Sequence, residues 1–195
     1  MADSEPTLDQ MRVLRSIVFA GALTGISDII GYQGAGLEAD VARLTDAGLV
    51  ENDGLLLPTE AGSAALERWY AKDRSGLGEQ DRDAIVERFR PLDMEVKRLA
   101  TRWQDADGRD DWDGRMSVIE ALTTLHDNMK TFVSDHRARL PRFEEFAARL
   151  ETAIGKILDG ETDYVVSARL PSYHTVWFEF HEDLLRTLER QRDPE

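Results

Sequence analysis

Apolar side chains recur every three or four residues along most of the chain, which is the spacing of one face of an α-helix. A first helix is predicted after Thr7, whose hydroxyl can cap the helix start. Its apolar positions are Met11, Leu14, Ile17 and Val18. A short second helix is predicted to begin at Ser27.

A hairpin signal interrupts the helical pattern after residue 48. The segment 37–47 has helical spacing and ends before Gly48, a residue typical of helix C-termini. Two short apolar runs then flank Asn52-Asp53-Gly54, and Asp-Gly is a strong signal for a tight β-turn. A further helix is predicted to open at Thr59. Helices followed by a small β-hairpin are the parts of a winged helix.

The run Ser75-Gly76-Leu77-Gly78 predicts a domain boundary. Residues 1–76 are expected to form the winged-helix domain, and residues 77–195 an all-helical domain with a ligand pocket. The helices predicted in the second domain are 81–90, 92–104, 116–139, 142–159 and 171–190. The fold class is therefore mainly α: an N-terminal winged helix with a small β-hairpin, followed by an antiparallel helical bundle.

Three local features refine this second domain. Pro91 is expected to separate or kink the first two helices, because proline lacks the backbone N–H that a helix needs. Residues 105–114 are predicted to form a polar loop. Tyr164-Val165-Val166 is predicted to be a short extended piece, and Pro171 to stand at the start of the last helix.

The charge of the first domain conflicts with DNA binding. The surface of a winged helix that faces DNA should carry cations or hydrogen-bonding side chains. The first turn of segment 37–47 instead carries Glu38 and Asp40, and the hairpin carries Glu51 and Asp53. Residues 1–75 contain six Lys or Arg against twelve Asp or Glu. DNA therefore remains a partner that the charge disfavours.

The amino-acid composition excludes several further classes of protein. The chain has no cysteine, which excludes disulfides and thiolate chemistry, and its net charge is −14. The N-terminus is acidic, and the apolar run 17–26 is too short and too broken by glycine to span a bilayer. The expected location is the cytoplasm, with no membrane partner.

Motifs for common cofactors are absent from the sequence. It contains no phosphate-binding loop of the ATP-binding type and no dinucleotide fingerprint. The acidic run that starts at Asp105 superficially resembles a calcium loop, but Arg109 interrupts its spacing and Met116 occupies the twelfth position. No cofactor and no metal site are expected.

The run 172–185 is the most unusual part of the chain. On a helix, one stripe holds Tyr173 and Trp177, and the adjacent stripe holds His174 and His181. The two histidines are about 10 Å apart along the axis, too far to chelate one metal ion as a pair. Either each ring fills a site at the edge of the core with one hydrogen bond, or both belong to a polar pocket.

Other helices supply candidates for such a pocket. Lys97 and Gln104 flank the buried face of segment 92–104, which Trp103 helps to mark, and His126 lies beside the apolar stripe of segment 116–139. These residues could converge with the two histidines between three helices. The alternative is that Lys97 pairs with Asp93 on a solvated face.

The pocket hypothesis assigns two roles. The candidate catalytic residues are His174, His181 and Lys97. The candidate substrate-binding residues are Gln104, His126, Tyr173, Trp177 and Trp103.

Several of these runs resemble a helical module that is common in actinobacterial proteins. The similarity lies in residues 91–104, Leu125-His126, Leu140-Pro141-Arg142 and residues 172–184, above all the run Ser-Tyr-His-Thr-Val-Trp-Phe-Glu. The module follows a winged-helix-like segment ending in Leu-Thr-x-x-Gly, which residues 57–62 match loosely. Such modules occur alone as MarR-like regulators, and attached to proteins resembling phosphoenolpyruvate synthase or pyruvate phosphate dikinase.

This resemblance implies an accessory or partner subunit of such an ATP-dependent phosphotransferase, whose ATP-grasp and phosphohistidine domains the chain lacks. The winged domain would then make protein contacts, and the helical domain would bind a small, phosphorylated substrate and assist phosphate elimination. Whether the chain is itself part of a phosphotransferase or dehydratase activity stays open. The alternatives are a MarR-like transcription regulator that dimerises and senses a ligand, and a scaffold whose aromatic stripe is only core.

Overall fold

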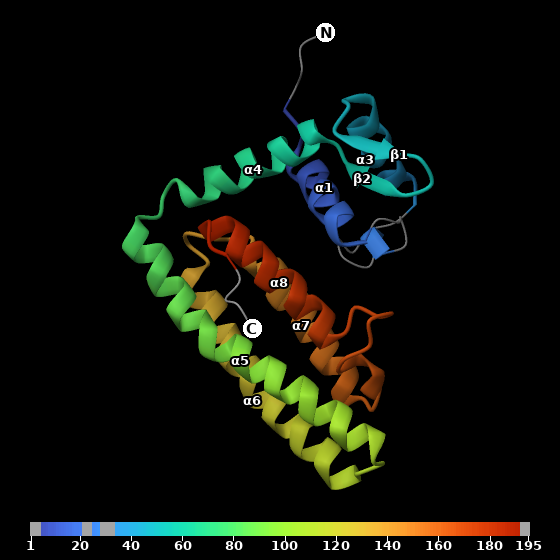
Figure 1. The fold of residues 1–195 in the computed structure, drawn as a ribbon, viewed down its shortest axis with the longest axis vertical. Coiled ribbons are helices and arrows are strands. Elements are labelled where there is room, and N and C mark those ends of the chain that lie inside the picture. Colours follow the sequence, from blue (N-terminus) through green and yellow to red (C-terminus); the bar gives the residue numbers. More distant parts are fainter. Residues whose placement is uncertain (1–4, 21–24, 28–33, 192–195) are drawn as a thin grey trace. The chain divides into compact units, whose positions relative to one another are not determined.

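The computed structural model describes residues 5–20, 25–27 and 34–191 (Figure 1). These residues are mainly helical and include one small antiparallel sheet, as the sequence predicts. The chain divides into two compact units, Met1–Lys72 and Asp73–Glu195. The predicted boundary at residues 76 and 77 lies in the connection after helix α4, Glu60–Arg74, whereas the units divide inside the last turn of that helix.

The N-terminal unit begins with helix α1, Leu8–Ala20. Thr7 caps this helix as predicted: its hydroxyl accepts the Gln10 backbone N–H at 3.2 Å, and the Gln10 side chain accepts the Thr7 N–H at 2.9 Å. Residues 25–27 are helical, so the helix predicted to begin at Ser27 begins before that residue. The rest of the short helix expected from Ser27 lies outside the described residues.

A helix and a hairpin complete this unit's core together with α1 and α4. Helix α3, Ala35–Asp46, is followed by strands β1, Val50–Asn52, and β2, Leu56–Pro58. The strands pair antiparallel, with Glu51 opposite Leu57, and the predicted turn holds Gly54 at a φ of 93°. The inward side chains of the hairpin, Val50 and Leu56, are buried among apolar residues of this unit.

Thr59 joins the hairpin to helix α4. The helix opens there as predicted: the Thr59 hydroxyl caps it by accepting the Gly62 backbone N–H at 3.0 Å, and donates to the Gly48 carbonyl at 2.7 Å. A β-carbon on Gly62 would lie 2.0 Å from the Leu49 carbonyl oxygen. The start of α4 is therefore fixed against the loop before β1 by close backbone contact.

The C-terminal unit is built from four helices that lie side by side (Figure 1). They are α5, Glu79–Gly108; α6, Trp112–His136; α7, Phe143–Leu158; and α8, Tyr173–Leu188. Helix α5 packs against α6 and α8, and α7 packs against the same two helices. Their apolar faces enclose one aromatic-rich core.

Three predictions about this unit are wrong. Helix α5 continues through Pro91, so the predicted separation into two helices is wrong, while a kink there stays a prediction; Phe89 before Pro91 and Val96 after it are buried in the same core. Most of the expected loop 105–114 is helical, since α5 continues to Gly108 and the Asp111 side chain caps α6 by accepting the Gly114 N–H at 2.9 Å. In place of the extended piece at Tyr164, a 3₁₀ turn spans Thr162–Tyr164.

None of the helices in the described part of the chain combines the length and the apolar content that crossing a bilayer requires.

Candidate ligand-binding cleft

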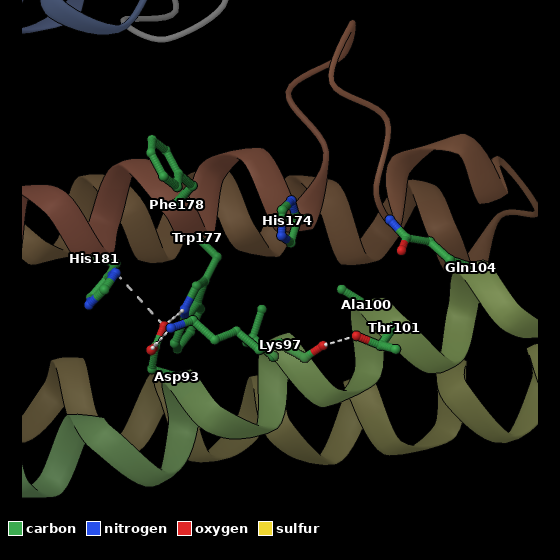
Figure 2. Close-up of a pocket in the computed structure, with 10 residues that line it drawn as sticks. Asp93, Lys97, Ala100, Thr101, Gln104, His174, Trp177, Phe178 and His181 are labelled. Carbon is green, nitrogen blue, oxygen red and sulfur yellow. Dashed lines mark hydrogen bonds and ion pairs between the residues drawn. The ribbon is translucent and has the colours of Figure 1, made fainter. Parts of the chain in front are cut away.

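Helix α8 presents its polar residues in a line because its start is fixed. Pro171 stands just before the helix, and the Ser172 hydroxyl caps it by accepting the Thr175 N–H at 3.2 Å. Helical spacing then brings His174, Trp177 and His181 to one side. This side faces α5 (Figure 2).

A cleft of about 350 Å³ lies between α5 and α8. Five of the eight predicted site residues line it: Lys97, Gln104, His174, Trp177 and His181. The other lining residues are Asp93, Val96, Ala100, Thr101 and Phe178. This size is typical of sites for small molecules.

The Asp93 carboxylate is the polar centre of the cleft. It accepts the indole N–H of Trp177 at 3.0 Å, and Lys97 Nζ lies 3.2 Å from its other oxygen. His181 Nδ1 lies 3.9 Å from Asp93 Oδ1, the oxygen that accepts the indole N–H (Figure 2). The Asp93 side chain is 13% exposed and the Lys97 side chain 52%, so the ion pair has one anchored partner and one that reaches solvent.

This geometry bears on the alternative that Lys97 only pairs with Asp93. The pair exists at i,i+4, as that alternative expects, but it does not lie on a fully solvated face. The Asp93 carboxylate is fixed to the buried Trp177 indole, and Lys97 is one wall of the cleft. The ion pair and the cleft are therefore compatible.

Aromatic stacking holds the inner end of the cleft. The Phe89 ring stacks on Trp177, with centroids 5.1 Å apart and an interplanar angle of 7°. It also stacks on His181 at 5.7 Å and 18°. His181 is buried, so its ring has the edge-of-core packing that a structural role requires and also borders the cleft.

His174 is the more accessible of the two histidines. Its backbone N–H donates to the Val165 carbonyl at 3.1 Å, while its side chain reaches the cleft. Partial burial of the ring lowers the pKa of His174 below its ordinary value of about 6.5, because burial penalises the charged form. This shift favours the neutral imidazole, which can accept a proton.

His126 does not join the cleft, which corrects the expected convergence between three helices. His126 Nε2 lies 2.9 Å from Glu151 Oε2 on α7, and Nδ1 lies 3.4 Å from the Tyr173 hydroxyl. The physical reason is that His126 sits on the side of α6 that packs against α7 and α8. The hydrogen bond from His126, followed by that from Lys130, lowers the pKa of the Glu151 carboxyl.

Two further candidates also lie outside the cleft lining. Tyr173 is 1% exposed, its hydroxyl is directed at His126, and burial raises the pKa of the phenol. Trp103 is buried in the core of this unit. Both are core side chains here, since the apolar face of their helices takes them inward.

Sequence reasoning missed Asp93 as a site residue. The signal was present, because Asp93, Lys97 and Gln104 recur near helical spacing on the flank of α5. Phe178, on the same stripe of α8 as the two histidines, was also missed and is 45% exposed. Among the described residues, no three His, Asp or Glu side chains gather as a metal ion would need.

Comparisons of the chain with protein-family models, with curated proteins and with solved structures found no match.

Proposed function

We propose that this chain is a small-molecule-binding accessory subunit, and that the cleft between α5 and α8 receives a small phosphate-bearing ligand. One observation carries the proposal: Lys97 and Gln104 from α5 and His174 and His181 from α8 line the same cleft, although the two helices are far apart in sequence. A cation, an amide and two imidazoles are groups that bind phosphate oxygens.

The Asp93–Lys97 pair suits a ligand of negative charge. The Lys97 side chain is half exposed, so its ammonium can turn from Asp93 to an incoming phosphate. The Asp93 carboxylate keeps its hydrogen bond from Trp177 in either state. Lys97 can therefore exchange its ion pair with Asp93 for one with the ligand, while the hydrogen bond between Asp93 and Trp177 is kept.

The same groups can assist a chemical step. A neutral His174 can take a proton from the ligand, and the Lys97 ammonium can stabilise the charge on a departing phosphate. In this form the chain works beside an ATP-dependent phosphotransferase like phosphoenolpyruvate synthase, as the resemblance of residues 172–184 implies. The winged-helix unit then serves protein contacts, and the helical unit supplies the substrate site.

Calorimetric titration tests ligand binding directly. Inorganic phosphate and phosphoenolpyruvate are the probes, and Lys97→Ala is expected to weaken binding by at least about tenfold. The matched control is Lys130→Ala, because the Lys130 side chain is also 52% exposed and pairs with a carboxylate, Glu151, at 3.1 Å. Equal loss in both variants, or no heat with either probe, contradicts the proposal.

A second experiment tests the partner. The product of a neighbouring reading frame with ATP-grasp and phosphohistidine domains is expected to co-purify with this chain. Turnover by the reconstituted pair should fall when His174 or His181 is replaced by alanine. If turnover is unchanged, the two histidines have no chemical role.

A MarR-like winged-helix regulator is the second candidate, because α3 is followed directly by a β-hairpin. The negative charge of the N-terminal unit disfavours DNA binding. Glu38, Glu51 and Asp53 are exposed, and Arg43 on the same helix as Glu38 pairs with Asp40 at 3.1 Å. A gel-shift assay with the adjacent intergenic DNA at low salt decides: a shift at micromolar protein supports the regulator, and its absence counts against it.

A further inference from the structure

The outer face of the β-hairpin is apolar although it does not contribute to the core. Leu55 and Leu57 are 61% and 52% exposed. Leu57 lies on the outer side of strand β2, and Leu55 stands immediately before that strand. Leu56 between them points inward and is buried with Val50. The inner face of the hairpin therefore already packs against the core, and the two exposed leucines contribute nothing to that packing.

Two carboxylates border these leucines. Glu51 stands directly opposite Leu57 in the strand register. Asp53 lies across the turn from Leu55, since its backbone N–H donates to the Leu55 carbonyl at 3.3 Å. Both acidic residues are exposed. We use the term hairpin face for the side chains of Leu55, Leu57, Glu51 and Asp53.

The charge of the hairpin face selects the kind of partner. Two carboxylates beside exposed leucines repel the phosphates of DNA and the headgroups of an anionic membrane. They attract Lys and Arg side chains, and the leucines gain by leaving water. An apolar surface with basic residues at its edge is complementary to both features.

We propose that the hairpin face is a docking surface for a protein partner that presents apolar side chains flanked by Lys or Arg. The leucines supply the contact that is buried on docking, and Glu51 and Asp53 fix which partners are accepted. This inference rests on the proposed role as a partner subunit. It concerns the N-terminal unit alone and makes no use of the cleft.

The test measures binding of short fluorescein-labelled peptides to the full chain by fluorescence polarisation. One peptide places leucines among lysines, a second replaces its leucines with serines, and a third replaces its lysines with glutamates. The leucine–lysine peptide is expected to bind at least about tenfold more tightly than either of the others.

Variants of the chain locate the binding surface. The double variant Leu55→Ser, Leu57→Ser is expected to bind the leucine and serine peptides equally. The double variant Glu51→Gln, Asp53→Asn is expected to bind the lysine and glutamate peptides equally. Leu8→Ser is the matched control, because Leu8 on α1 is 57% exposed and lies outside the hairpin. It should bind the leucine–lysine peptide as the unchanged chain does.

Several outcomes overturn the proposal. They are equal binding by the double-serine variant, loss of binding in Leu8→Ser alone, and tighter binding of a DNA duplex or of neutral lipid vesicles through the same leucines. Lys97→Ala should bind the peptide normally. A chain that binds the peptide but not phosphate therefore retains the docking surface and loses only the cleft proposal, and the reverse result loses only the docking surface.

Discussion

The Asp93 carboxylate has a structural task that can be measured apart from any ligand. Asp93→Ala removes the acceptor of the buried Trp177 indole N–H. A buried donor left without an acceptor costs about 1–3 kcal/mol, so we expect a loss of about 2 kcal/mol in the unfolding free energy of the C-terminal unit. Chemical denaturation followed by tryptophan fluorescence measures it.

The control for Asp93→Ala lies on the same helix. Glu95 pairs with Arg98, whose side chain is 52% exposed, at 2.5 Å. Glu95→Ala is expected to cost less than about 1 kcal/mol, because exposed ion pairs contribute little. Equal losses for the two variants would mean that the indole bond adds nothing.

His174 gives the cleft a predictable pH response. Its pKa is lowered in the folded state by desolvation, so the unfolded chain binds this proton more tightly. The stability that depends on a neutral His174 is present above the ordinary pKa of histidine and is lost as the pH falls below it. Between about pH 7.5 and 5.5, the unchanged chain should therefore lose more stability than His174→Gln. Denaturation at several pH values compares them, and parallel curves would contradict the assignment.

At the scale of the element, two glycines in helices test opposite effects of an added methyl group. Gly62→Ala places a β-carbon against the Leu49 carbonyl and should destabilise the N-terminal unit by about 1–3 kcal/mol. Gly155 in α7 has no atom within 4 Å of such a carbon. Gly155→Ala should therefore stabilise the C-terminal unit by about 0.5–1 kcal/mol. Amide hydrogen exchange in α4 and α7 reports each unit, and a neutral Gly62→Ala would refute the close contact.

The sequence predicts the elements well where local chemistry decides them. The cap at Thr7, the helix that opens at Thr59 and the turn at Gly54 follow from side-chain hydrogen bonds and backbone freedom within a few residues. The unbroken α5 could not be predicted in this way. Pro91 disfavours a helix locally, whereas residues of α5 on both sides of it, such as Phe89 and Val96, are buried in a core shared with the distant Trp177.

For the candidate site, too, the sequence predicts what depends on one helix and not what depends on the packing of two helices. Spacing within α8 predicts His174 and His181 on one stripe and Trp177 on the adjacent stripe, and all three side chains line the cleft. Which neighbouring helix faces them is a matter of tertiary packing. That is why α5 contributes Asp93 to the cleft, and why His126 on α6 turns to Glu151 instead.

At the scale of the whole C-terminal unit, Arg142 joins distant parts of the chain. Its guanidinium pairs with Asp183 at 3.0 Å, donates to the Thr187 hydroxyl at 2.6 Å, and also pairs with Asp73. The Asp183 side chain is fully buried. Arg142→Ala removes the Arg142 cation from that buried carboxylate, and we expect a loss of about 3–5 kcal/mol in unfolding free energy.

The neighbouring Arg139 is the control for this prediction. It pairs with Asp81 at 2.8 Å, but its side chain is 57% exposed. Arg139→Ala should cost less than about 1 kcal/mol in the same denaturation experiment. Similar values for Arg142→Ala and Arg139→Ala would show that the buried cluster does not stabilise the unit.

The distribution of the four histidines allows a direct test of where a ligand binds. His174 and His181 line the cleft, whereas His126 bonds to Glu151 and His136 Nδ1 lies 2.6 Å from the Phe132 carbonyl oxygen. In a chain with ¹⁵N-labelled histidine, each ring signal can be assigned from single His→Gln variants. Phosphoenolpyruvate is then added while the four ring signals are followed by NMR. The account predicts saturable shifts for His174 and His181 and unchanged signals for His126 and His136. Unchanged signals for His174 and His181, or shifts confined to the other two, would contradict a ligand site between α5 and α8.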